Sequence, residues 1–176
     1  HEMKQDLVYQ SGFQKILMQL ASRFIYISAP ETDSVINDAL RQIGEYIGVD
    51  RSYIFRYDFE NETMTNSHEW CSLDIPSLIG NRHRIPIHLV ADWLEAHRRG
   101  ETIGIENLKQ LDPENPIRIL LKSPDIQSMI TIPMISQKNC LGFVGFESIK
   151  GIKKWFDSEI SLLKIFTGML ANLQEK

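Results

Sequence analysis

Residues 126–148 read IQSMITIPMISQKNCLGFVGFES, and this stretch decides the fold. Apolar and β-branched residues dominate 126–135 and 140–148, as is typical of buried strands. Between them, Ser136-Gln137-Lys138-Asn139 has the small polar residues that tight turns use. The stretch therefore predicts an antiparallel hairpin near the C-terminal end of the chain.

A second strand pair is predicted upstream of this hairpin. Arg51–Asp58 is rich in aromatic and β-branched residues and alternates with a period of two. Asp58–Asn61 is a plausible turn into another strand over Met64–Trp70. One face of the first of these strands carries three aromatic residues, Tyr53, Phe55 and Tyr57.

Amphipathic helices are predicted on both sides of the strands. Apolar residues recur at helical spacing from about Asp6 to Ile27, and again up to Ile47, after which Gly48 suits a left-handed cap. A closing helix is expected from about Asp157, as N-cap, to Gln174. That helix has an additional apolar stripe beside its main one, formed by Leu162, Ile165 and Met169.

The additional stripe suggests a partner for the terminal helices. One stripe is enough to dock a helix on a sheet, so we expect the first and last helices to pack side by side and to form a parallel homodimer. The alternative is that both stripes are used within one monomer.

The segment between the two strand pairs mixes short elements. Short strands are expected at 82–87 and 101–105, with a helix closed by Gly100 between them and a small helix after Pro116. The last two are identified by apolar residues at helical spacing: Leu89, Val90, Trp93, Leu94 and His97 in one, and Ile117, Leu120 and Leu121 in the other.

The whole pattern predicts an α+β fold around an antiparallel sheet. With 176 residues the chain fits a single domain, 1–176. Its parts are the N-terminal helices at about 6–48, the sheet and its connections at 51–148, and the closing helix at 157–174.

Composition excludes several classes of protein. The formal charge of −4 argues against a nucleic-acid binder, which needs clustered Lys and Arg. No apolar run approaches the roughly 18 residues that span a bilayer, so we expect a cytoplasmic protein without direct membrane contact. The sequence begins with His1 rather than Met, which indicates a piece of a longer chain.

Four segments together resemble the GAF domain family. In the order in which that family has them, they are VDRSYIFRYD at 49–58, SMITIPM at 128–134, LGFVGFE at 141–147 and WFDSEISLL at 155–163. The resemblance spans nearly the whole chain. It implies an antiparallel sheet with the terminal helices on one face and short helices and loops over a small-molecule pocket on the other.

The resemblance also implies a role. GAF domains act as regulatory inputs to histidine kinases, diguanylate cyclases, phosphodiesterases and transcriptional regulators. We therefore expect a non-catalytic sensor joined covalently to an output domain. The alternative from another class is a ligand-free dimerisation module.

Cofactors known from this family find little support in the sequence. The bilin-binding branch attaches its chromophore through a cysteine, commonly followed by histidine, but Asn115–Lys122 contains neither, and Cys71 lacks the alternative Asp-x-Cys-Phe setting. Phe156, Asp157 and Glu159 are similar to the end of the cyclic-nucleotide pattern, but at different spacing. Neither a covalent bilin nor a cyclic nucleotide is expected. The histidines are not spaced as metal or haem ligands are: His68, His83, His88 and His97.

A thiol enzyme is the remaining alternative. The free-methionine-sulfoxide reductases are the enzymatic GAF branch and need a reactive thiolate. This chain lacks their Gly-Val-Cys-Gly-like segment. We interpret Cys71 and Cys140 as structural thiols.

An aromatic ligand pocket is the site that the sequence predicts. Its wall would combine residues of the first two strands, the covering helix and the later hairpin, with hydroxyl groups orienting a small ligand. The predicted residues are Tyr53, Phe55, Tyr57, Trp70, Trp93, Met129 and Thr131. The alternative is that they fill an ordinary second core.

Overall fold

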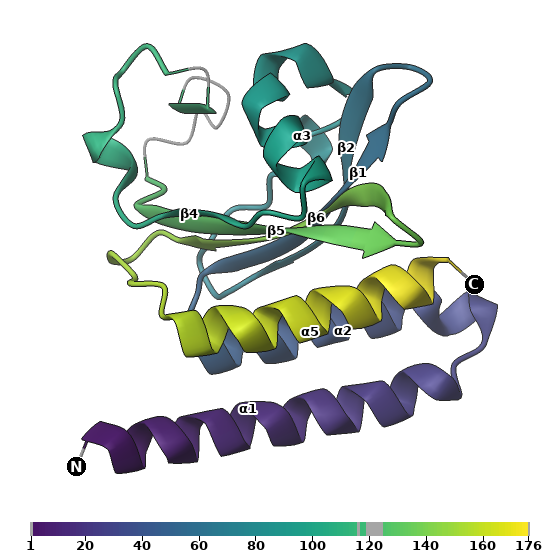
Figure 1. Ribbon diagram of the computed structural model, residues 1–176, viewed down its shortest axis with the longest axis vertical. Helices are drawn as coiled ribbons and strands as arrows, with labels where there is room; N and C mark the ends of the chain where they lie inside the picture. The colour runs from purple at the N-terminus through teal and green to yellow at the C-terminus, as the bar shows by residue number, and fades with distance from the viewer. Residues whose placement is uncertain (1, 116, 119–124, 176) are drawn as a thin grey trace.

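The computed structural model describes residues 2–115, 117–118 and 125–175, and it has a layered α+β architecture (Figure 1). A curled sheet separates two groups of helices. Its strands are β1 (Arg51–Asp58), β2 (Thr63–Cys71), β3 (Ile85–Pro86), β4 (Ile103–Ile105), β5 (Ser128–Ser136) and β6 (Asn139–Ser148). The α-helices are α1 (Glu2–Ile25), α2 (Thr32–Ile47), α3 (Ala91–Arg98) and α5 (Asp157–Gln174). Single 3₁₀ turns lie at Ala29–Glu31, Ile79–Asn81, Ile87–Val90 and Leu108–Gln110.

The sheet has the strand order β3-β2-β1-β6-β5-β4, and every neighbouring pair is antiparallel. The predicted hairpin forms β5 and β6. Its two-residue loop, Gln137-Lys138, has φ values of 50° and 70°, which matches the type I′ turn that suits twisted antiparallel strands. The α+β fold expected from the sequence is confirmed. Of the small helix predicted after Pro116, Leu120 and Leu121 lie outside the described residues.

A β-bulge interrupts the pairing of β1 with β2. Ile54 pairs with His68, whereas Phe55 pairs with Asn66, so that Ser67 has no partner on β1. An extra residue in one strand reverses the faces to which the following side chains point. His68 consequently points toward α2, where its Nε2 lies 2.9 Å from Asp33 Oδ1.

The main hydrophobic core lies between the sheet and the helices. In Figure 1, α2 and α5 cover one face of the sheet and α1 packs on the outside of these two helices. Gly48 ends α2 with φ of 78°, as its predicted cap role requires. Fully buried residues from each layer meet in this core, including Phe13, Leu20, Ile36, Leu40, Ile43, Ile54, Ile130, Val144, Phe146, Leu163, Phe166 and Leu170.

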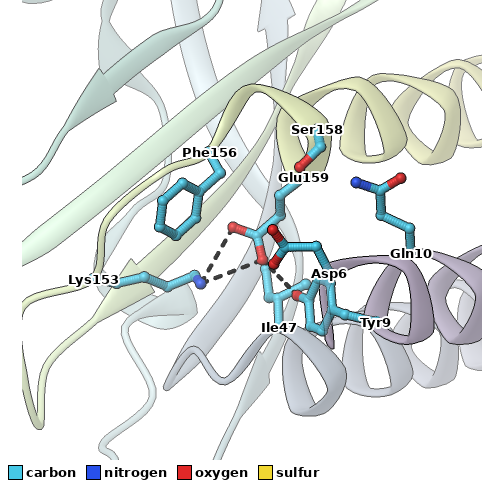
Figure 2. Close-up of a pocket in the computed structure, with 8 residues that line it drawn as sticks. All are labelled: Asp6, Tyr9, Gln10, Ile47, Lys153, Phe156, Ser158 and Glu159. Atoms are coloured by element: carbon cyan, nitrogen blue, oxygen red, sulfur yellow. Dashed lines mark hydrogen bonds and ion pairs between the residues drawn. The ribbon is translucent and has the colours of Figure 1, made fainter. Parts of the chain in front are cut away.

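The helices α1 and α5 lie side by side near their N-terminal ends. The hydroxyl of Tyr9 donates a 2.5 Å hydrogen bond to Glu159 Oε2, and Lys153 Nζ lies 3.2 Å from Glu159 Oε1 (Figure 2). The two helices run in the same direction (Figure 1). These contacts agree with the expected side-by-side packing of the terminal helices.

Two expectations about α5 are wrong. Its N-cap is Phe156, which makes no side-chain cap bond, so Asp157 is the first residue of the helix rather than its cap. Leu162 is buried in the main core of the monomer, so its side chain is not free to contact a second copy. Of the predicted dimer stripe, Ile165 is 54% exposed and Met169 is half-buried.

A second apolar cluster covers the other face of the sheet, beneath α3. Among the described residues, no helix combines the length and the apolar character needed to cross a membrane.

Candidate functional site

Six of the seven predicted pocket residues lie on the α3 side of the sheet. Five belong to the second apolar cluster, and the sixth, Thr131, lies on the same face and bonds to α3. The six are Tyr53, Phe55, Tyr57, Trp93, Met129 and Thr131. All of them are buried.

Phe143 of β6 is the centre of this cluster. Its ring centroid lies 5.1 Å from that of Phe55 in a stacked arrangement and 5.8 Å from that of Trp93 in a perpendicular one. Tyr57 and His97 also contact it, with centroids at 5.7 and 4.8 Å. Offset stacked and edge-on arrangements are those that aromatic pairs prefer, so the cluster is well packed.

Trp70 does not belong to this group, and its predicted place in the pocket wall is wrong. It packs at the edge of the main core, on the helix face of the sheet. A Cβ atom added at Gly44 of α2 would lie 2.5 Å from the Trp70 ring. The reason is the bulge at Ser67, which turns Trp70 to the opposite face from that expected for regular alternation.

His97 joins α3 to two strands. Its Nδ1 lies 2.8 Å from the Tyr57 hydroxyl and its Nε2 lies 2.9 Å from Thr131 Oγ1. Burial lowers the pKa of His97 to about 4, so the imidazole is neutral at pH 7. A neutral imidazole can accept from one hydroxyl and donate to the other.

The hydroxyls of Tyr57 and Thr131 are thus occupied within the protein. Among the described residues, Trp93 Nε1 and Arg82 Nη2 are buried nitrogen atoms on this side without a hydrogen-bond partner, as is Arg51 Nε at the start of β1. All three can only donate. The Arg82 guanidinium lies over the ring of Tyr53, 5.2 Å from its centroid.

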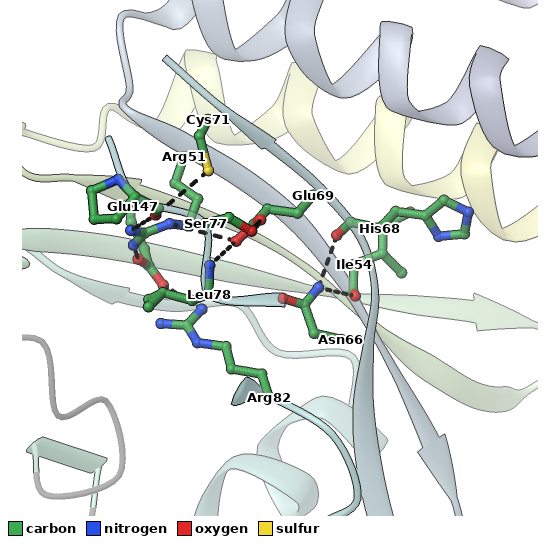
Figure 3. A network of polar contacts seen from close by, with 11 residues as sticks. Arg51, Ile54, Asn66, His68, Glu69, Cys71, Ser77, Leu78, Arg82 and Glu147 are labelled. Atoms are coloured by element: carbon green, nitrogen blue, oxygen red, sulfur yellow. Dashed lines mark hydrogen bonds and ion pairs between the residues drawn. The ribbon is translucent and has the colours of Figure 1, made fainter. Parts of the chain in front are cut away.

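Beside Arg82 lies a buried network of charges, where β1 begins and β6 ends (Figure 3). Glu147 is fully buried; its Oε2 accepts a 2.5 Å bond from Arg51 Nη1 and its Oε1 a 3.0 Å bond from Arg82 Nη1. Arg51 also donates to the Pro76 carbonyl at 2.8 Å. Glu69 Oε2, at 3.7 Å from Arg51 Nε, supplies the second negative charge. Two cations and two carboxylates therefore compensate one another.

The loop after β6 is held by Asp50. Its Oδ2 accepts bonds from the backbone N–H groups of Ile149, at 2.6 Å, and Lys150, at 2.8 Å. Asp50 immediately precedes β1, so this contact fixes the start of β1 against the end of β6. It gives a structural reason for an acid in the VDR sequence at 49–51.

Neither cysteine has the environment of a reactive thiolate. Burial raises the pKa of the Cys71 thiol, helped by the negative charge of Glu69, and burial also raises the pKa of Cys140. A redox-active thiol needs a lowered pKa. Among the described residues, no group of three or more His, Cys, Asp or Glu side chains could hold a metal ion.

One hydrogen-bond chain has the residue order of a catalytic triad. Asp33 bonds His68 Nε2, and His68 Nδ1 lies 2.8 Å from Ser67 Oγ. Ser67 is the bulged residue of β2 and is not on a strand-to-helix elbow, the position that exposes a nucleophilic serine in α/β-hydrolases. We interpret the chain as a contact that fixes the bulge to α2.

Sequence reasoning missed several residues of this face. Phe143 lies in a strand that is apolar on both faces, so periodicity did not assign it to either. Arg82 and Glu147 were not identified because a buried ion pair between distant strands has no local signature. A charged residue within the otherwise apolar end of β6 was the one available signal for Glu147.

A curated relative is a signalling protein. The chain is 29% identical over 150 residues to the methanogenesis regulatory histidine kinase FilI of Methanothrix harundinacea (strain 6Ac). The match covers 80% of this chain and 16% of that protein. The chain therefore spans about a sixth of the length of this relative.

Solved structures share the fold. The GAF domain of Thermosynechococcus elongatus PixJ in its blue-light-absorbing form superposes with a TM-score of 0.71 at 15% identity, covering 83% of this chain and 86% of that one. The phycocyanobilin-bound GAF domain of a cyanobacterial phytochrome gives a TM-score of 0.75 at 13% identity, covering 91% and 92%. At such low identity the likeness concerns the fold alone.

The sequence model of the GAF domain matches residues 31–173, from just before α2 almost to the end of α5. The match includes all six strands and both helices that cover the sheet. Fold, element order and sequence agree, and the chain belongs to the GAF domain family.

Proposed function

We propose that this GAF domain is a non-catalytic sensory module that regulates an attached output domain, such as a histidine kinase, through its terminal helices. The relationship to a histidine kinase carries the proposal. The family assignment supports a sensory or regulatory role. We add to this role that the domain does no chemistry itself and that its terminal helices carry the signal.

The aromatic cluster beneath α3 supports this face of the sheet as the place where a ligand binds. It joins α3, β1, β5 and β6 through Phe143 and the two bonds of His97. A ligand that displaces α3 would break the His97 contacts with Tyr57 and Thr131. The sheet that carries these residues also carries α2 and α5 on its other face.

The unpaired donors support a proposal about the class of ligand. Trp93 Nε1 and Arg82 Nη2 are both buried and offer N–H groups without acceptors. Leaving such groups unpaired costs about 1–3 kcal/mol each, which a ligand oxygen would recover. We therefore propose a small ligand with carbonyl or carboxylate oxygens and an apolar body.

A thermal-shift screen tests this proposal. A ligand of the folded state raises stability by RT ln(1 + [L]/Kd), so carboxylates should shift the midpoint, and apolar compounds of the same size that lack an oxygen atom should not. Arg82→Gln and Trp93→Phe should each reduce the shift, whereas Trp70→Phe, on the other face, should leave it unchanged. The absence of a shift with any carboxylate or carbonyl compound would favour the ligand-free dimerisation module instead.

The second part of the proposal is a parallel homodimer. Along the exposed side of α1, Met18 is 72% and Ile25 65% exposed, and the two are seven residues apart, as in a helical seam. Ile165 of α5 is also exposed. A second copy that covers these residues would place the terminal helices of both chains in one bundle.

A further inference from the structure

A separate cavity lies on the helix side of the molecule, between the N-terminal part of α1 and the first turn of α5. Its volume is about 690 Å³, within the range of sites for small molecules. Figure 2 shows its lining side chains, which come from α1, α2, α5 and the segment before α5. They are Asp6, Tyr9, Gln10, Ile47, Lys153, Phe156, Ser158 and Glu159.

The cavity contains a buried carboxylate that is incompletely paired. Glu159 is 4% exposed. Its Oε2 accepts bonds from the Tyr9 hydroxyl and from Lys153 Nζ, whereas Oε1 lies 3.2 Å from the same Nζ without receiving a hydrogen bond of good geometry. Among the described residues lining this cavity, the ammonium group of Lys153 is thus the one cation beside the Glu159 carboxylate, and Oε1 can accept a hydrogen bond from a further donor.

The charges around the cavity favour a cation. The carboxylate of Asp6 also turns into it (Figure 2). The lining therefore has two negative charges and one positive charge, that of Lys153.

The walls suit the apolar part of such a ligand. Tyr9 and Phe156 present aromatic rings, Phe156 being 58% exposed, and Ile47 adds an aliphatic surface. Lys153 shows how an ammonium group can be bound here, since its Nζ pairs with Glu159 and lies 5.3 Å from the centroid of the Trp155 ring. An ammonium group between a carboxylate and an aromatic ring is a favourable arrangement.

We propose that this cavity binds a small molecule carrying a primary ammonium group on a short apolar chain. The ligand ammonium binds Glu159 and Asp6, in competition with Lys153, and its chain lies against Tyr9 and Phe156. Because α1 and α5 each contribute a carboxylate, the bound ligand holds the two terminal helices together.

The test uses n-butylammonium chloride as probe, with sodium butyrate and sodium chloride at equal ionic strength for comparison. Binding is followed by the amide chemical shifts of Ser158 and Glu159 in NMR titrations. Butylammonium should shift these signals with saturation, and butyrate should not. Equal small shifts with all three salts would overturn the proposal.

Two variants separate a ligand site from a structural ion pair. Asp6→Asn, at an exposed position, should weaken butylammonium binding by about fivefold, as loss of a partly exposed charge pair predicts. Lys153→Gln removes the internal competitor and should strengthen binding. Asp74→Asn and Lys164→Gln make the same charge changes outside the cavity and should leave the affinity unchanged. An unchanged affinity in Asp6→Asn would overturn the proposal, as would weaker binding in a folded Lys153→Gln.

Discussion

The ring of Tyr53 lies directly against the backbone of Gly145, its partner across the β1–β6 ladder. A Cβ atom at position 145 would lie 2.3 Å from two atoms of that ring, which is far too close. Gly145→Ala should therefore displace the fully buried Tyr53 and destabilise the fold by about 1–3 kcal/mol. The midpoint of urea unfolding measures this loss.

Gly168→Ala is the matched control. Nothing lies within 4 Å of a Cβ added at Gly168, which sits inside α5. Alanine is favoured over glycine in a helix by about 0.5–1 kcal/mol, so this variant should gain stability. Equal stability of the two alanine variants would contradict the close packing of Tyr53 on β6.

Stability should depend on pH through His97. Its pKa falls from the usual 6.5 to about 4 in the folded protein because the imidazole is buried. Between pH 6.5 and 4 the unfolded chain therefore binds a proton at His97 that the folded protein does not bind. The free energy of unfolding keeps its full value above pH 6.5 and decreases as the pH falls toward 4, by about 3 kcal/mol in all.

Urea unfolding at several pH values between 7 and 4 measures this slope. His97→Gln lacks the titrating group and should show a flatter profile over the same interval, although its stability at pH 7 is lower. A wild-type free energy of unfolding that stays constant from pH 6.5 to 4.5 would show that His97 is not buried as a neutral group.

The charge network of β1 and β6 should be sensitive to its central carboxylate. Glu147→Gln leaves the cations of Arg51 and Arg82 without their shared partner in a buried site. Breaking a buried pair in this way costs about 3–5 kcal/mol. Glu101→Gln removes the exposed partner of Arg99, where solvent screens the charges, and should change the stability far less. Thermal unfolding of both variants gives the comparison.

The bulge at Ser67 explains how far the sequence could predict the site. Aromatic alternation located β1 at Arg51–Asp58 without error and placed Tyr53, Phe55 and Tyr57 on one face. The same alternation placed Trp70 on the wrong face, because the one extra residue at the bulge reverses the face to which the following side chains point. The sequence TNSHEW contains no glycine or proline that would indicate a bulge.

Long-range contacts explain the other differences. The apolar residues of β6 are buried on both faces, so Phe143 could be assigned only through its partners. The neutral state of His97 depends on the strands that cover it, not on its place in α3. The end of α2 could be located from the sequence because a cap such as Gly48 acts locally.

Self-association should depend on the outer side of α1. Met18→Glu changes an exposed residue, so the monomer should keep its fold while the dimer dissociates. Light scattering after size-exclusion chromatography reports the molar mass. Leu73→Glu alters another exposed apolar residue, in the loop after β2, and should leave the mass of the wild type unchanged. A monomeric wild type at high micromolar concentration would contradict the homodimer.

Cysteine chemistry should be dispensable. With both thiol pKa values raised by burial, Cys71 and Cys140 should react slowly with a disulfide reagent at pH 7. A variant with both Cys71→Ser and Cys140→Ser should therefore respond to ligand as the wild type does. Loss of the response on mild oxidation, restored by these substitutions, would favour a thiol-based sensor.

The shared direction of α1 and α5 has a consequence for longer proteins that contain this domain. The backbone enters the helical layers at one end, near Tyr9 and Glu159, and leaves them at the other, near Gln174. Modules joined before and after it would be arrayed in line rather than folded back on each other. In such an array, a slight rotation or sliding of α5 against α1 would change how the modules on the two sides of the domain are rotated relative to each other.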